Sequence, residues 1–133
     1  MSKTLDNHLD LAASPEETTK RVLTAFTDPQ RVRRDDPGRP EVCNIYSLHK
    51  IFSRASDVNT VYDECVTAAR GCVDCKRHVA DSINDYLKEL RERREEIKSK
   101  PGYVQEILHE GGKKARAIAV ETINEVYEKM GLS

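Results

Sequence analysis

Four cysteines restrict the possible folds of this chain more than any other residues, because a shared role for them must bring separate segments together. They follow the spacing C-x21-C-x6-C-x2-C, at Cys43, Cys65, Cys72 and Cys75. The pair Cys72-x-x-Cys75 stands at the start of a predicted helix, where free backbone N–H groups and the helix dipole favour thiolates. The basic residues that flank the group, and that suit an anionic centre, are Arg70, Lys76 and Arg77.

Several interpretations of this spacing stay open. Free cysteines often pack as small hydrophobic side chains, and Cys65, on an apolar helix face, fits that interpretation by itself. A thioredoxin-like redox pair is disfavoured, because no βαβ pattern surrounds the C-x-x-C. Four thiolates suit a tetrahedral zinc ion and a [4Fe–4S] cluster equally well. The spacing does not choose between the two, although the lack of two C-x2-C units leans slightly toward the cluster.

The histidines add one candidate to this group. Of the four in the chain, only His78 lies near the thiols in sequence, three residues after Cys75. It is an alternative fourth ligand should Cys43 not bind, but four cysteines are enough. We therefore expect His78 beside the thiolates or at the surface.

Composition favours a single small helical domain. The chain has 133 residues, 34% charged and 38% hydrophobic, with no Trp and six Gly, which disfavours a barrel or sandwich rich in turns. Its net charge of -1 gives no bulk attraction to nucleic acid or to a membrane. No stretch approaches the roughly 18 apolar residues of a membrane span, and no signal peptide is evident. We therefore expect a cytoplasmic protein without a membrane partner. In the reducing cytosol, cysteines bind metals or take part in redox chemistry more often than they form structural disulfides.

Residues 1–13 show no helical period, and the first helix begins after them. Ser14 suits an N-cap, Pro15 the first helical position, and Glu17 closes a capping box onto Ser14. We expect this helix to reach Asp28-Pro29. Its predicted buried face consists of Val22, Leu23 and Phe26. Residues 30–40 follow, with four Arg, two Pro and one Gly, and predict an exposed irregular segment, called here the basic loop.

Apolar residues at helical spacing mark the rest of the chain. Helices are predicted over about 42–52, 58–69 (ended by Gly71 in a left-handed conformation) and 73–98, with a break at Pro101-Gly102. A last apolar stretch runs from Val104 to Met130, and Gly111-Gly112 either divides it or lies within one helix. The residues predicted to face inward are Ile45, Leu48, Ile51, Phe52, Val61, Tyr62, Cys65, Val79, Ile83, Tyr86, Leu87, Leu90, Ile97 and the apolar residues of the last stretch. The sequence thus predicts an all-α bundle of five or six helices with a short irregular N-terminal segment.

Several motifs, in this order and at these distances, resemble the C-terminal part of bacterial tryptophanyl-tRNA synthetases, which are class I aminoacyl-tRNA synthetases. Residues 1–4 match the end of the KMSKS signature, with Thr4 in place of its last Ser. The segments that resemble the family's entry into its helical domain and its C-terminal helix are Thr27-Asp28-Pro29, Arg31-Val32-Arg33-Arg34, Asp36-Pro37-Gly38, Pro40-Glu41, Cys43-Asn44-Ile45, Lys114 to Ala119 and Met130-Gly131-Leu132. The resemblance covers essentially the whole chain.

The resemblance also implies a ligand set. A subset of these synthetases, known from thermophilic bacteria, carries a [4Fe–4S] cluster in the anticodon-binding domain on a nearly identical cysteine pattern. The present sequence departs from it by about one residue in the first interval. By resemblance, Cys43, Cys65, Cys72 and Cys75 are the cluster ligands.

The domain organisation follows from the same resemblance. Residues 1–13 correspond to the end of the KMSKS loop of the catalytic domain, and residues 14–133 to the helical anticodon-binding domain of the class I synthetase type. Ser2 and Lys3 would be a remnant of the ATP site; ATP and Mg²⁺ serve the full-length parent, a tryptophan–tRNA ligase expected to be a homodimer. Because the nucleotide-binding fold is missing from this sequence, we expect the chain alone not to charge tRNA. The resemblance also allows this part of the protein to be a monomer.

An anticodon-binding role requires basic residues that reach RNA. The candidates for contact with tRNA(Trp) are Arg31, Arg33, Arg34, Arg39, Arg70, Lys76 and Arg77. Each of them also has an ordinary role open to it as a solvated or internally paired charge. Two functions without RNA compete with this one: a zinc-stabilised helical interaction module, and a cysteine-based redox sensor with an exposed thiol of low pKa.

Overall fold

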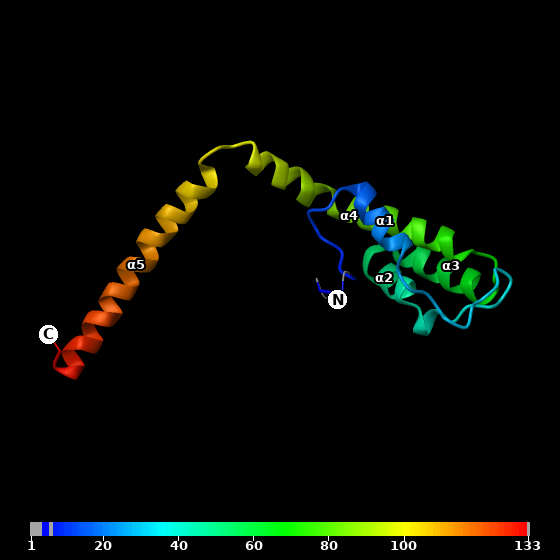
Figure 1. Cartoon of the computed structure of the whole chain (residues 1–133), viewed down its shortest axis with the longest axis horizontal. Coiled ribbons are helices and arrows are strands. Elements are labelled where there is room, and N and C mark those ends of the chain that lie inside the picture. The colour runs from blue at the N-terminus through cyan, green and yellow to red at the C-terminus, as the bar shows by residue number, and fades with distance from the viewer. Residues whose placement is uncertain (1–3, 6, 133) are drawn as a thin grey trace. The chain divides into compact units, whose positions relative to one another are not determined.

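The computed structural model describes residues 4, 5 and 7–132, and the regular structure in that part of the chain is entirely helical (Figure 1). The predicted all-α class is therefore confirmed. The elements are α1 (Pro15–Leu23), the 3-10 helix η1 (Pro40–Val42), α2 (Asn44–Phe52), α3 (Ala55–Val66), α4 (Cys72–Lys98) and α5 (Tyr103–Met130). Ser2 and Lys3, the predicted remnant of an ATP site, lie outside the described residues.

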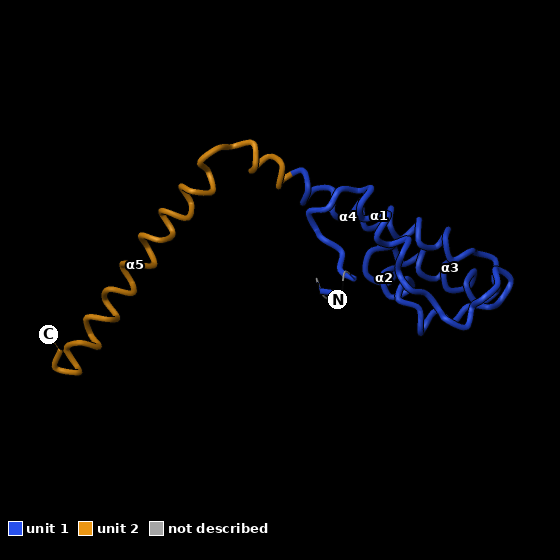
Figure 2. The backbone as a smooth tube through the Cα atoms, viewed as in Figure 1, with its two compact units in different colours: residues 1–92 blue, residues 93–133 orange. Residues whose placement is uncertain are grey.

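The chain divides into two compact units, residues 1–92 and residues 93–133 (Figure 2). The first unit contains the hydrophobic core, where α1 and α2 pack against the N-terminal part of α4. The core residues are Val22, Ile45, Val79, Ala80, Ile83 and Leu87. Helix α3 lies against α2, with the rings of Tyr46 and Tyr62 5.8 Å apart.

Helix α1 begins as predicted and ends early. The Ser14 hydroxyl accepts a hydrogen bond from the Glu17 N–H, and the Ser14 N–H donates to the Glu17 carboxylate, so the capping box is complete. The helix stops at Leu23, because Thr24 caps it and its hydroxyl donates to the Arg21 carbonyl at 2.8 Å. Phe26 therefore lies beyond the helix and is 68% exposed, and its predicted burial was wrong.

The ends of α3 also differ from the prediction. The helix starts at Ala55 and stops at Val66, and the left-handed residue after it is Ala68, with φ of 59°, rather than Gly71. The N–H groups of Ala68 and Arg70 donate to the Cys65 and Glu64 carbonyls, which closes the turn early. The other residues of the first unit that were predicted inside but are exposed are Ile51, Tyr62, Tyr86 and Leu90.

In the second unit, α5 runs through Gly111-Gly112 without a break. Gly102 precedes the helix with φ of 85°, and Gly131 ends it with φ of 66°, so glycines supply the positive φ at both ends. None of the residues of α5, all of which the structure describes, is buried, so the apolar side chains predicted to pack there are exposed. Among the described helices, none combines the length and the apolar character that crossing a membrane requires.

Candidate metal centre

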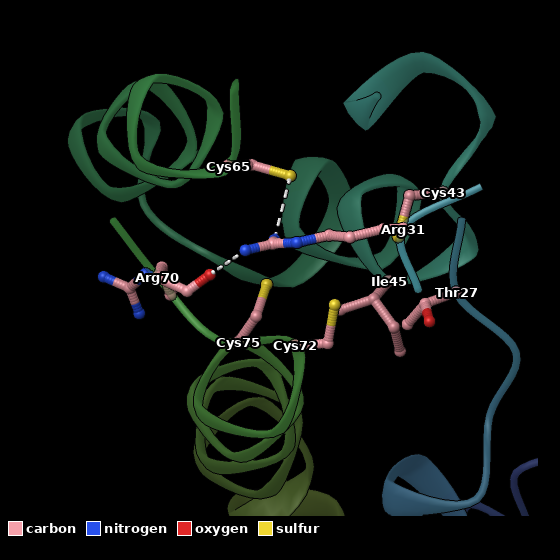
Figure 3. Close-up of a pocket in the computed structure, with 8 residues that line it drawn as sticks. All are labelled: Thr27, Arg31, Cys43, Ile45, Cys65, Arg70, Cys72 and Cys75. Carbon is pink, nitrogen blue, oxygen red and sulfur yellow. Dashed lines mark hydrogen bonds between the residues drawn. The ribbon is translucent and has the colours of Figure 1, made fainter. Parts of the chain in front are cut away.

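All four cysteines line one pocket in the first unit, the four-thiol pocket (Figure 3). Cys43 is the residue before α2, Cys65 lies near the end of α3, and Cys72 and Cys75 occupy the first turn of α4. The other residues that line the pocket are Thr27, Arg31, Ile45 and Arg70. The structure therefore brings together the four residues that the spacing singled out.

The basic loop closes one side of this pocket. The Gly38 N–H donates to the Cys65 carbonyl at 2.9 Å, and a Cβ atom at Gly38 would lie 2.5 Å from the Cys65 sulfur. No side chain fits at that distance, so the close approach requires glycine at position 38. The spacing of the cysteines did not reveal this residue.

Arg31 extends across the pocket between the cysteines (Figure 3). Its Nη2 donates to the carbonyls of Arg70 and Arg34, at 2.8 and 2.9 Å, and its Nη1 lies 3.9 Å from the Cys65 sulfur. Its Nε is buried and has no hydrogen-bond partner among the described residues. A buried N–H without an acceptor is costly, so this atom marks a place where a group with acceptor atoms would fit.

Two of the four thiols, those of Cys65 and Cys75, lie in surroundings that oppose the free thiolate. Burial raises the pKa of the Cys75 thiol to about 12, and it also raises that of Cys65. At neutral pH both sulfurs therefore keep their protons unless a cation replaces them. A metal bound by these two sulfurs would displace their protons, and without a metal the two thiols are poor nucleophiles.

A buried histidine, His49, contacts Cys75, whereas sequence proximity had indicated His78. His49 is fully buried, with Nε2 3.5 Å from the Cys75 sulfur and 3.2 Å from the Cys75 carbonyl oxygen. His78 is partly exposed and lies beside Arg70 and Asp57. Sequence reasoning missed His49 because it stands 26 residues before Cys75 and reaches it only through the packing of α2 on α4.

The structure divides the seven predicted RNA-binding residues into two groups. Four have side chains engaged inside the unit: Arg31 at the pocket, Arg39 on Asp28, Arg70 on Glu64 and Lys76 on the Leu23 carbonyl. The other three are exposed: Arg33, Arg34 and Arg77. Arg77 lies 3.6 Å from Asp74, whereas neither Arg33 nor Arg34 forms an ion pair with any described residue.

The pocket suits an anionic metal–thiolate group. Four thiolates around a doubly charged core keep two negative charges, and the Arg31 guanidinium brings a positive charge to the pocket, whereas that of Arg70 is paired with Glu64. No three Cys, His, Asp or Glu side chains in the described part of the chain converge on a point that could hold one metal ion. A single zinc ion requires four sulfurs at about 2.3 Å from it, whereas a [4Fe–4S] cluster takes one thiolate on each of its irons.

The comparisons of this chain with known proteins agree with one another. Residues 1–88 match the family described as tRNA synthetases class I (W and Y). A tryptophan–tRNA ligase of Aquifex aeolicus is 38% identical over 133 residues, covering 99% of this chain and 34% of that protein. That of Deinococcus radiodurans is 40% identical, covering 98% and 40%. A crystal structure of tryptophanyl-tRNA synthetase from Campylobacter jejuni, complexed with ADP and tryptophan, has a TM-score of 0.87 and 33% identity, covering 99% and 41%. The chain thus spans about a third to two-fifths of the length of these relatives.

Proposed function

Because this chain belongs to the class I tRNA synthetases of the tryptophan and tyrosine group, we propose that it is the C-terminal portion of a tryptophan–tRNA ligase and recognises the anticodon stem-loop of tRNA(Trp). Within this function, Cys43, Cys65, Cys72 and Cys75 hold a [4Fe–4S] cluster, as in the subset of the family that carries one. The observation that carries the cluster proposal is the four-thiol pocket with the unpartnered Nε of Arg31 inside it.

A cluster in this pocket joins segments that are distant in sequence. Its four ligands come from the start of α2, the end of α3 and the start of α4. In a unit this small, such a cross-link supplies stability that the hydrophobic core alone does not. It also holds Cys65, and with it Gly38 and the basic loop, in one position.

Anaerobic reconstitution with ferrous iron and sulfide tests the cluster. We expect a brown protein with broad visible absorption, whose four thiols resist labelling until the metal is chelated. Changing any one cysteine to serine, Cys43→Ser first, should reduce the absorption. Lys88→Ala, an exposed change farther along α4, is the control and should leave the spectrum unchanged. Zinc bound in preference to iron, or a Cys43→Ser variant with the wild-type spectrum, would contradict the proposal.

The exposed arginines of the basic loop are the proposed contact with RNA. Arg33 and Arg34 are free of ion pairs to the described residues and stand on the loop that borders the four-thiol pocket. Because the chain as a whole is almost uncharged, RNA binding must come from a local patch of this kind. Arginines held in internal ion pairs, such as Arg39, do not belong to the patch.

Binding of the tRNA(Trp) anticodon stem-loop, measured as a function of salt, tests this interaction. The double change Arg33→Ala and Arg34→Ala should weaken binding and lower the salt slope by roughly 0.7 for each phosphate that the variant no longer neutralises. The matched control removes two arginines of α4, Arg93 and Arg94, which are paired with Glu96 and Glu95. Equal weakening in the two double variants, or binding that does not change with salt, would count against the basic loop.

The remaining parts of the ligase belong to the full-length parent. We propose that its catalytic portion uses ATP and Mg²⁺, that Ser2 and Lys3 contribute to its ATP site, and that this portion covers apolar side chains of α5. The large exposed apolar residues of α5 include Ile107, Leu108, Ile118, Ile123 and Met130. Slower hydrogen exchange of α5 in the full-length ligase than in this chain supports that cover, and equal rates in the two would contradict it.

A further inference from the structure

His49 is a buried polar residue that the four-thiol pocket itself does not explain. It lies on α2 with none of its surface exposed, between Ser53, which caps the C-terminal end of α2, and Cys75 of α4. Nδ1 is 2.8 Å from the Ser53 hydroxyl, and Nε2 faces both the carbonyl oxygen and the sulfur of Cys75. Hydrogen-bond partners at both nitrogens offset the cost of burying the imidazole and fix the orientation of the ring.

The hydrogen-bond partners of His49 Nε2 decide whether this nitrogen carries a proton. Nε2 lies 3.2 Å from the Cys75 carbonyl oxygen, which can only accept a hydrogen bond. When Cys75 is a ligand, its sulfur has no proton, and Nε2 faces only acceptors. Nε2 must then be the donor. The Ser53 hydroxyl, which faces Nδ1, donates to the Ser82 hydroxyl at 3.1 Å, and the Ser82 hydroxyl donates to the His78 carbonyl.

We propose that His49 is a positioning residue for Cys75, which it holds in place by donating its Nε2 proton to the ligating sulfur and the neighbouring carbonyl. This inference rests on the proposed cluster. Hydrogen bonds to ligating sulfurs withdraw negative charge from an iron–sulfur cluster, stabilise its reduced state and raise its reduction potential. The same bond orients the thiolate and slows loss of the cluster.

Two substitutions separate this role from simple packing. In His49→Gln the amide reaches the position of Nε2 and keeps a donor to Cys75, whereas in His49→Asn the shorter amide reaches only toward Ser53. We expect His49→Asn to have a lower reduction potential and to lose its cluster in air on the order of 10-fold faster, with His49→Gln close to the wild type. Thermal melts of the metal-free chains show whether both variants are folded. Should His49→Asn not fold, Ser53→Ala carries the test, with a smaller shift in the same direction.

The outcomes distinguish this inference from the cluster proposal. A reconstituted wild-type chain without iron and sulfide overturns both. A wild-type cluster whose potential and lifetime are unchanged in His49→Asn, or changed equally in His49→Asn and His49→Gln, overturns the role of His49 alone. The same holds for Ser53→Ala if that variant has to be used and behaves as the wild type.

Discussion

Asp28 and Arg39 join the two ends of the basic loop through a buried carboxylate. The Asp28 side chain accepts hydrogen bonds from the backbone N–H groups of Gln30 and Arg39 and from the Arg39 guanidinium, whose Nη2 is 2.6 Å away. The guanidinium above all, with those N–H groups, holds the pKa of Asp28 well below its usual range. The segment between these residues carries Arg31 and Gly38, so this pair fixes the loop that closes the four-thiol pocket.

Asp28→Asn should therefore lower the melting temperature, with a defined dependence on pH. A carboxyl whose pKa is lowered by folding stabilises the protein above the pKa of the unfolded group, about 4, and loses that effect as pH falls further. We expect the difference in melting temperature between wild type and variant to stay constant from pH 8 to about 5 and to become smaller at lower pH. Asp35→Asn, an exposed change in the same loop, should melt as the wild type does. A gap that widens in acid would contradict this role of Asp28.

Two glycines give opposite predictions for the same substitution. Gly38→Ala places a Cβ 2.5 Å from the Cys65 sulfur, whereas Gly111, inside α5, has nothing within 4 Å. We expect Gly38→Ala to reduce the iron bound per chain after reconstitution, because Cys65 must shift. Gly111→Ala should keep the iron and gain helical stability of roughly 0.5–1 kcal/mol. If the Gly38→Ala variant binds as much iron per chain as the wild type, the pocket tolerates movement of Cys65.

At the level of elements, α2 allows a matched test of the core. Ile45 is fully buried against α1 and α4, whereas Ile51, six residues later on the same helix, is 68% exposed. Ile45→Ala should lower the free energy of unfolding by about 2–5 kcal/mol, and Ile51→Ala by no more than about 0.5 kcal/mol, both measured by urea denaturation. Similar decreases in the two variants would mean that α2 packs through a different face.

The helices that local chemistry determines were predictable from the sequence. The Ser14 capping box, the break at Pro101-Gly102 and the extent of α4 follow from a few adjacent residues. The end of α1 and the left-handed Ala68 were not, because the turns there depend on hydrogen bonds that several alternative residues could have made. The continuity of α5 was left open, since a glycine pair inside a helix weakens it without ending it.

The candidate site, too, could be predicted from the sequence only in part. The gathering of the cysteines was expected, because three of them lie close together in sequence around one turn. The parts supplied by Arg31, Gly38 and His49 were missed, since these residues reach the sulfurs only after the basic loop and α2 have packed. Four of the predicted RNA-binding residues turned out to be engaged internally, which sequence position does not reveal.

For the whole molecule, protection from hydrogen exchange should differ between the two units. The first contains the buried core, whereas α5 has no buried residue. Exposed helices open with little cost, so we expect the amides of α5 to exchange much faster than those of Val79, Ile83 and Leu87 in the isolated chain. Exchange followed by mass spectrometry of peptides checks this. Protection of α5 equal to that of the α4 core would contradict it.

Iron, acid-labile sulfide and zinc, determined per chain after anaerobic purification, test the proposed centre most directly. A [4Fe–4S] cluster on Cys43, Cys65, Cys72 and Cys75 predicts iron and sulfide close to four each, with little zinc. Loss of iron in Cys72→Ser would connect the metal to the four-thiol pocket. One zinc per chain, or no metal with four thiols open to labelling, would contradict the cluster and the cross-link between α2, α3 and α4 that it provides.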